Sequence, residues 1–302
     1  MKIAVLSRLP DVYGNRRLIE AGRQRGCDIA VVDPFSVPLV DPEPSISGSL
    51  SAAGFDAVIP RFSPYWQDQG TAVLQRWQSL GIVSLNSAAA ISLARDMPQS
   101  GAMFRANGIA CPVSVCLDNL TGASALLNAT FDLPLLIKQQ GGMQGSGVER
   151  VDDLDRALMR MAELHRNGKP FLVQEFIAEA QGVDRRLLVL NNEVIAGMTR
   201  RAAKGDFRAN THLGGTAEAY CPGAEEIRMA LSATRLLGLD FAGVDIIPSQ
   251  RGPLLLEVNA CPGFEHLERV SGVDVAGKLL DLLITRFKRK NLSVNNQNNR
   301  KY

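Results

Sequence analysis

Short apolar runs alternate with longer amphipathic segments in the first third of the chain. The candidate strands are 3–6, 29–32, 57–59 and 82–85, and the candidate helices are 16–25 and 67–80. Strands that alternate with helices in this way predict βαβ units and a parallel sheet. We therefore expect a small α/β domain over 1–96, and a linking segment at 97–101, where Pro and Gly interrupt the pattern.

The pattern changes after this segment, because several apolar runs lie close enough together to form hairpins. The candidate strands are 135–138, 172–176, 187–190, 194–198, 243–247 and 254–259, and the candidate helices are 153–166 and 225–237. Residues typical of turns separate two pairs of these strands, at 191–192 and at 248–253. We expect an α+β domain with antiparallel sheets over 97–285.

Composition and charge narrow the class of protein. The 302 residues are 46% hydrophobic and 21% charged, as in folded globular proteins, and they suffice for about two domains. No apolar run approaches a bilayer span and the first residues lack a signal-peptide pattern, so we expect a cytoplasmic protein with no membrane partner. Five cysteines without a C-x-x-C pair argue against zinc ribbons and disulfide frameworks.

The basic residues gather at the end of the chain. The net charge is +2, but residues 286–302 carry six Lys or Arg and no acid, which leaves −4 for the rest. We expect a basic disordered tail over 286–302; an RNA-contacting arm is the alternative. With few aromatic residues and no basic groove, direct nucleic-acid binding is not required.

Acidic and amide side chains interrupt two apolar runs near the end of the chain. Glu257 and Asn259 stand two residues apart on one strand, so they share a sheet face, and a turn centred near Arg251 would place Asp245 opposite Glu257. Adjacent buried carboxylates repel each other unless a cation neutralises them, and an all-oxygen set suits Mg²⁺ or Mn²⁺. A sheet face that is simply open to water remains the alternative.

A glycine-rich segment follows the strand that ends at Lys138. Four glycines within 141–147, Gly145 and Gly147 among them, would allow backbone N–H groups to approach a phosphate chain. The segment matches neither the P-loop nor the dinucleotide-binding fingerprint, and a plain turn is the alternative. Lys138 in an apolar run favours an anionic partner, although a surface lysine would also fit.

Two further stretches are rich in charge. One is the strand 171–177 with the following 182–186, and the other carries Arg200, Arg201, Lys204 and Arg208 within nine residues. These arginines would hold carboxylates or phosphates in a bidentate way if a nucleotide lay nearby. Otherwise the second stretch is an exposed charged loop.

Other kinds of catalytic site find no support in the sequence. The histidines show no metal-binding spacing, no G-x-S-x-G motif occurs, and Cys261 lacks a nearby histidine base.

Taken in order, these features resemble the ATP-grasp superfamily, and residues 1 to about 283 are similar to the RimK-type α-L-glutamate ligases. The matching stretches are 1–8, 55–61, 144–148, 200–202, 205–208 and 242–246. The resemblance implies an ATP-grasp fold of mixed α/β and α+β class, in which an N-terminal pre-ATP-grasp α/β domain precedes two lobes that clasp ATP. It also implies a homo-oligomer, specifically a tetramer.

The resemblance assigns roles to residues already singled out. Lys138, Gly145, Gly147, Arg208, Ala209 and Asn210 would contact the ATP phosphates, Glu175, Phe176 and Asp184 the adenine and ribose, and Asp245, Glu257 and Asn259 two Mg²⁺ or Mn²⁺ ions. Arg186 and Arg201 would be catalytic, since they would orient the carboxylate and steady the oxyanion. In such enzymes ATP phosphorylates a carboxylate, and an amine attacks the acyl phosphate to form an amide.

The resemblance further implies that L-glutamate is joined to the C-terminal carboxylate of a small-subunit ribosomal protein. Two positions depart from the family pattern: Met97 replaces a lysine expected to reach the nucleotide, and Ala209 replaces a small hydroxyl residue. A ligase that joins small-molecule carboxylates and amino acids is therefore one alternative. A nucleotide-binding regulator without catalysis is the other.

Overall fold

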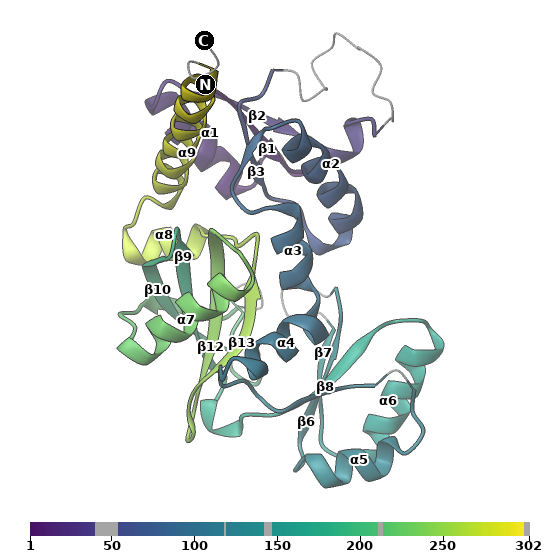
Figure 1. The fold of residues 1–302 in the computed structure, drawn as a ribbon. Coiled ribbons are helices and arrows are strands. Elements are labelled where there is room, and N and C mark those ends of the chain that lie inside the picture. Colours follow the sequence, from purple (N-terminus) through teal and green to yellow (C-terminus); the bar gives the residue numbers. More distant parts are fainter. Residues whose placement is uncertain (40–53, 118, 142–146, 211–213, 299–302) are drawn as a thin grey trace.

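The N-terminal part of the chain is a parallel sheet with helices packed on it (Figure 1). The computed structural model describes residues 1–39, 54–117, 119–141, 147–210 and 214–298, with side chains up to 292. The strand order is β2-β1-β3-β4. Its elements are β1 (Lys2–Leu6), α1 (Tyr13–Gln24), β2 (Asp28–Val32), the short helices η1 (Pro34–Ser36) and η2 (Pro64–Trp66), β3 (Ala57–Pro60), α2 (Gln67–Ser79), β4 (Val83–Ser84) and α3 (Ala88–Arg95).

The segment at 97–101, predicted to link the two parts of the chain, is helical. Helix α4 (Met97–Ala106) begins there, one residue after α3 ends. The Asp96 carboxylate accepts a hydrogen bond from Gln99 N at 3.0 Å and so caps the helix, while Pro98 occupies its first turn. Asp followed by Pro is a helix-start signal, because proline needs no backbone N–H partner there.

A second sheet, of four antiparallel strands in the order β5-β8-β6-β7, lies at the other end of the molecule in Figure 1. Its elements are β5 (Ser114–Cys116), α5 (Ala123–Thr130), β6 (Leu135–Gln139), β7 (Val148–Val151), α6 (Leu154–Arg166) and β8 (Phe171–Glu175). The apolar face of the sheet packs with α5 and α6 into a core of its own, which includes Leu127, Ile137 and Met161.

The third sheet has five antiparallel strands in the order β11-β10-β9-β12-β13. Its elements are η3 (Ala178–Ala180), β9 (Val183–Leu190), β10 (Glu193–Arg201), β11 (Thr216–Ala219), α7 (Ala224–Leu236), β12 (Phe241–Ser249), β13 (Gly252–Asn259) and α8 (Glu265–Ser271). The two predicted hairpins are confirmed: Asn191 and Asn192 adopt positive φ between β9 and β10, and β12 returns as β13.

The parallel sheet and the five-stranded sheet share hydrophobic cores, because single clusters contain residues of both, such as Val58 with Val244 and Val5 with Leu188. The fully buried Asn86 links the two sheets. Its amide donates to Phe241 O and Ala260 O, and its Oδ1 accepts from Asp240 N and Phe241 N, all within 3.0 Å. The β5–β8 sheet instead has a separate core.

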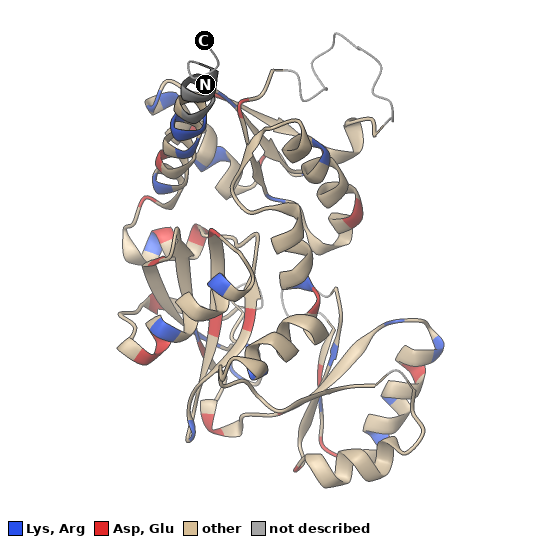
Figure 2. Cartoon of the chain, in the orientation of Figure 1, with Lys and Arg blue, Asp and Glu red and all other residues tan. Residues whose placement is uncertain are grey.

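The predicted disorder of the basic tail is wrong over 286–298. Helix α9 (Val275–Asn298) runs through this segment and packs beside α1, and Figure 2 shows basic positions along it. The apolar side of its first half, which includes Leu279 and Leu283, is buried. Arg286 then forms a two-point ion pair with Asp240, so the helix continues beyond its apolar part.

None of the helices in the described part of the chain is both long and apolar enough to cross a membrane.

Candidate functional site

A row of charged side chains crosses four strands of the five-stranded sheet. Asp245 on β12 lies opposite Glu257 on β13 and opposite Arg186 on β9, and Asp184 on β9 lies opposite Arg200 on β10. The predicted pairing of Asp245 with Glu257 is confirmed. It depends on a bulge, because Ile246 pairs with Leu255 and Leu256 is left over.

The Asp245 carboxylate is buried and held by two arginines. Arg186 donates from Nε and Nη2 to its two oxygens, both at 2.6 Å, and Arg200 donates from Nη2 at 2.8 Å. Arg200 also grips Asp184 in a bidentate way at 2.6 Å. Burial alone would raise the pKa of Asp245, but the two guanidinium groups outweigh it and hold the pKa well below its usual value.

Glu257 is the accessible end of this row. Its side chain is 61% exposed, and its nearest cation is Arg186 Nη2 at 3.9 Å. The pKa of Glu257 is raised, first by the surrounding protein, which limits its hydration, and second by the Asp245 charge. A cation that approached this edge would relieve that repulsion.

Lys138 reaches the same place from the β5–β8 sheet. Its strand, β6, belongs to another core, yet the charges of Glu257 and Asp245 act on the Lys138 ammonium. Burial lowers the pKa of Lys138, and the two carboxylates partly offset that effect. Among the described residues Lys138 has no ion pair within 4.0 Å. The ammonium therefore lies near enough for the two carboxylate charges to act on it, without forming an ion pair with either.

The chemistry of the donor set suits a hard divalent cation. Asp245, Glu257 and Asn259 supply carboxylate and amide oxygens from one face of the β12–β13 hairpin. No group of three or more His, Cys, Asp and Glu residues that could hold a metal occurs in the described ranges, so the amide is needed to complete the set. Asn259 Oδ1 accepts from Cys261 N at 2.9 Å, and Asp245 is shared with the arginines, so both would have to exchange partners to bind a metal.

Residues predicted to surround the adenine lie at the end of β8. Phe176 packs edge-on against Phe207, with ring centroids 5.7 Å apart, which brings the end of β8 to the loop after β10. Glu175 Oε1 accepts from Val113 N at 2.7 Å and from Arg251 at 2.6 Å. Asp184, predicted at the ribose, is 8% exposed and its carboxylate is occupied by Arg200.

The loop after β10 carries the residues predicted near the phosphates. Arg208 forms a bidentate pair with Asp206, which lowers the pKa of Asp206 to about 2 through hydrogen bonding. Ala209 is buried, and Asn210 accepts from Gly215 N through its backbone carbonyl at 3.3 Å. Gly147 has φ +81°, which favours glycine. Gly145 lies outside the described residues.

The structure brings Arg200, rather than Arg201, to the charged row. Successive residues of a strand point to opposite faces, so Arg201 faces away from Asp245, and it pairs with the exposed Glu218 at 2.9 Å. The catalytic role of Arg201 stays a prediction. The alternation of side chains along β10 predicts that Arg200 and Arg201 lie on opposite faces of the sheet. Only the pairing of β10 with β9 shows which of the two is buried.

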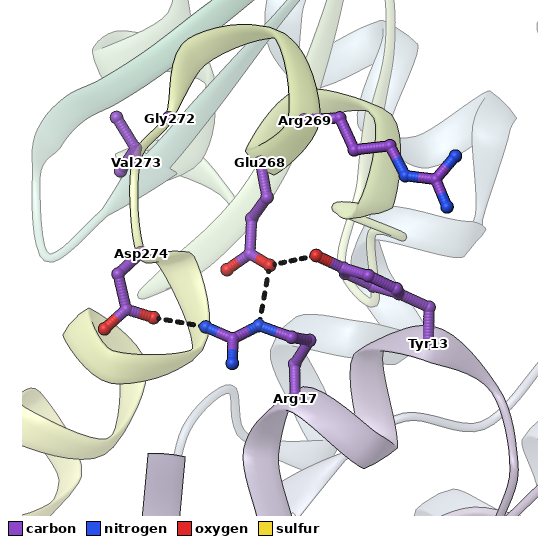
Figure 3. Close-up of a pocket in the computed structure, with 7 residues that line it drawn as sticks. All are labelled: Tyr13, Arg17, Glu268, Arg269, Gly272, Val273 and Asp274. Atoms are coloured by element: carbon purple, nitrogen blue, oxygen red, sulfur yellow. Dashed lines mark hydrogen bonds and ion pairs between the residues drawn. The ribbon is translucent and has the colours of Figure 1, made fainter. Parts of the chain in front are cut away.

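A pocket between α1 and α8, away from the charged row, is lined by residues that bind one another (Figure 3). Tyr13 and Arg17 of α1 contact Glu268 of α8 at 2.8 and 3.2 Å, and Arg17 also contacts Asp274 at 3.0 Å. Because these charged groups are matched with one another, the pocket joins α1 to the C-terminal helices and offers no unsatisfied charge to a ligand.

Comparisons with known proteins identify the family of both parts of the chain. The RimK PreATP-grasp domain model matches residues 1–91 and the RimK-like ATP-grasp domain model matches residues 94–283. A probable alpha-L-glutamate ligase of Aeromonas salmonicida is 40% identical over 96% of this chain and 99% of its own length.

Solved structures show the same fold. A RimK domain ATP-grasp protein of Sphaerobacter thermophilus superposes with a TM-score of 0.73 at 26% identity, over 93% of this chain and 98% of that one. The ATP-grasp ligase PsnB, in complex with a phosphomimetic variant of minimal precursor, Mg and ADP, gives 0.71 at 24% identity, over 95% and 98%.

The two sheets that face each other across Lys138 and Glu257 are thus those of an ATP-grasp fold behind a pre-ATP-grasp domain. The expected fold is confirmed, and so is an ATP-dependent ligase as the class of enzyme. The chain belongs to the RimK-like ATP-grasp family.

Proposed function

We propose that this protein is an α-L-glutamate ligase that uses ATP to activate the C-terminal carboxylate of an acceptor protein and joins L-glutamate to it. The observation that carries the proposal is the pairing of Asp245 with Glu257 on β12 and β13, with Lys138 of the other sheet near enough to feel both charges. A polyphosphate and its cation need positive and negative groups close together. The Aeromonas salmonicida relative, named a probable alpha-L-glutamate ligase, supports glutamate as the amino acid.

Metal ions fit the hairpin end of the site. We assign Asp245, Glu257 and Asn259 as ligands of two Mg²⁺ or Mn²⁺ ions, because their oxygens share one face and Glu257 is accessible. When bound, such ions neutralise the phosphates and so favour phosphoryl transfer. Mg in the PsnB complex supports the choice of Mg²⁺.

The nucleotide would lie between the two facing sheets. Lys138 would bind phosphate oxygens, and Phe176, set against Phe207, would flank the adenine. Glu175 and Asp184 would accept from adenine and ribose, with Asp184 sharing its charge with Arg200. Five further residues would contact the phosphates: Gly145, Gly147, Arg208, Ala209 and Asn210.

The arginines of the site would act on the reacting carboxylate. Arg186 lies beside both carboxylates of the hairpin. If a metal ion bound Asp245, the Arg186 guanidinium would be free to orient the acyl group. Arg201 faces away from Asp245, so it would have to leave Glu218 to orient the carboxylate and steady the oxyanion. We propose a small-subunit ribosomal protein as the acceptor and a cytoplasmic homo-tetramer as the working form, without nucleic acid.

The test is mass spectrometry of candidate acceptors after incubation with enzyme, ATP, Mg²⁺ and glutamate. Wild type is expected to add mass in steps of one glutamate residue. Glu257→Gln is expected to lower the rate by about 10- to 100-fold, because it removes one charged metal ligand. It is a safer variant than Asp245→Ala, which would leave Arg186 and Arg200 without their shared carboxylate.

Glu193→Gln, on the exposed start of β10, is the matched control and is expected to keep wild-type activity. ADP release with small carboxylates, but no mass gain on any protein acceptor, would contradict a protein-modifying enzyme and favour a small-molecule ligase. No metal-dependent ADP release at all would contradict catalysis.

A further inference from the structure

Two arginines at the boundary between the parallel sheet and β13 lack the acidic partners that other arginines in the interior have. Arg61 directly follows β3, and Arg95 ends α3. Neither forms an ion pair with any carboxylate of the described residues, whereas Arg186 and Arg200 both do. Burial lowers the pKa of both Arg61 and Arg95, and the Cys261 thiol partly offsets this effect on each.

Arg61 is held in place by neutral groups. Its Nε donates to Asn15 Oδ1 at 3.0 Å, its Nη1 donates to Pro262 O at 3.2 Å, and its guanidinium lies over the Phe264 ring at 5.0 Å. Asn15 is fully buried and is itself fixed by its amide, which donates to Ser7 Oγ and Leu9 O. The protein thus positions this guanidinium without neutralising it.

Glycine at position 14 gives Arg61 its space. A Cβ built at Gly14 would lie 2.6 Å from Arg61 Nη2, although Gly14 has no positive φ that would require glycine. The absence of a side chain at this position therefore serves the guanidinium and not the backbone.

Arg95 adds a second cation with an unused donor. Its Nη2 donates to Phe62 O at 2.6 Å and its guanidinium lies over the Phe62 ring at 5.1 Å. Its Nη1 is buried and has no hydrogen-bond partner. A buried charged donor without a partner is costly, and an anion would satisfy it.

The pair lies close to the reaction site but apart from the metal ligands. Arg61 contacts Pro262, three residues after Asn259 on the same chain segment. Arg95 donates to Phe62 O, and Phe62 is the residue next to Arg61. The two arginines are therefore held on one short segment beside the end of β13, and neither pairs with Asp245 or Glu257.

Resting on the proposed function, we infer that Arg61 and Arg95 bind a carboxylate of the incoming glutamate, so that its amine is presented toward the Asn259 end of β13. A planar guanidinium matches a carboxylate in a bidentate way. The negative nucleotide already has Lys138 and the metal ions as partners, which leaves the amino acid as the anion to be placed.

The experiment is steady-state kinetics of Arg61→Gln and Arg95→Gln with glutamate, ATP and acceptor each varied. The KM for glutamate is expected to rise about 10- to 100-fold, as for the loss of one charged hydrogen bond. The KM values for ATP and acceptor should change by less than about twofold, while Arg61→Lys, which keeps the charge, recovers part of the affinity. Arg23→Gln, exposed on α1, is the matched control.

Thermal unfolding distinguishes glutamate binding by Arg61 from a merely structural role of this residue. Free glutamate is expected to raise the Tm of wild type but not of Arg61→Gln, and inorganic phosphate should not replace it. Two analogues identify which carboxylate of glutamate is bound: glutamine lacks the side-chain carboxylate, and glutamate α-amide lacks the α-carboxylate. Wild type should prefer glutamate over the analogue that lacks the bound carboxylate, and Arg61→Gln should lose this preference.

Three outcomes would overturn the inference: an unchanged KM for glutamate, an equal loss for glutamate and ATP, or a rise in the KM for the acceptor alone. Failure of wild type to add glutamate to any acceptor would contradict the proposed function itself. The two failures are thus distinguishable.

Discussion

Glu226 shows how a buried charge is accommodated when its partners are part of the protein. Its side chain is 5% exposed, and it accepts from Arg185 at 2.6 Å, from Tyr220 at 2.7 Å and from Gly223 N at 3.1 Å. Burial would raise the pKa of Glu226, but the hydrogen bonds from Tyr220 and Arg185 outweigh it and lower the pKa. Burial, together with the hydrogen bond to Glu226, raises the pKa of Tyr220 to about 12.

Glu226→Gln is expected to lower the free energy of unfolding by about 2 kcal/mol near neutral pH, because it removes charged hydrogen bonds in a buried place. Since the folded-state pKa is depressed, the stabilisation is present above the ordinary pKa of Glu and is lost as the pH falls through the folded value. Urea unfolding between pH 7 and pH 3 measures this difference, which should shrink on acidification. Glu225→Gln, exposed next to it, should cost nothing; an equal cost for both would refute the account.

At this scale the sequence predicts partners only where they are near in the chain. Asp245 and Glu257 lie on one hairpin, so counting from the turn was enough to pair them. Arg186 reaches Asp245 because β9 lies beside β12, and that neighbour relation connects residues 59 positions apart. The lack of an acidic partner at Arg61 and Arg95 likewise cannot be predicted from the sequence, because it depends on which carboxylates the fold brings near them.

Helix α9 shows the same limit at the scale of an element. The last part of the helix is a run of basic residues without acids, a pattern that predicts a solvated, disordered end. Arg286 changes this outcome through Asp240, whose position just before β12 no local pattern reveals. The strands and helices that were predicted are those in which local periodicity shows the buried face.

Arg286→Gln is expected to lower the free energy of unfolding by about 1 kcal/mol, a modest value because the pair is partly exposed and screened. Chemical denaturation at low and high salt measures it, and high salt should reduce the difference. Lys288→Gln, exposed on the same helix, is the comparison and should leave stability unchanged. A loss that is the same for both variants would mean that the helix needs only net charge there.

At the scale of the whole molecule, the five-stranded sheet shares its cores with the parallel sheet, and the β5–β8 sheet has its own. The site lies where these two parts face each other, with Lys138 on one and the charged row on the other. The resemblance to a family predicted this arrangement of domains, while composition alone gave only two folded parts.

Before anything binds, the site is electrically balanced: Asp184, Asp245 and Glu257 are matched by Arg186, Arg200 and Lys138. A divalent cation that entered alone would leave an excess of positive charge, whereas a cation that arrives with a nucleotide brings compensating negative charge. Mn²⁺ is therefore expected to bind at least about tenfold more tightly when ADP is present, as measured by calorimetry.

Lys138→Met sharpens this expectation, because it should tighten the binding of Mn²⁺ alone and weaken the binding of ADP. Equal affinity for Mn²⁺ with and without ADP would contradict the account. The physiological consequence concerns metal supply: such an enzyme does not compete for free ions, and its activity follows the fraction of cellular nucleotide that is already complexed with metal.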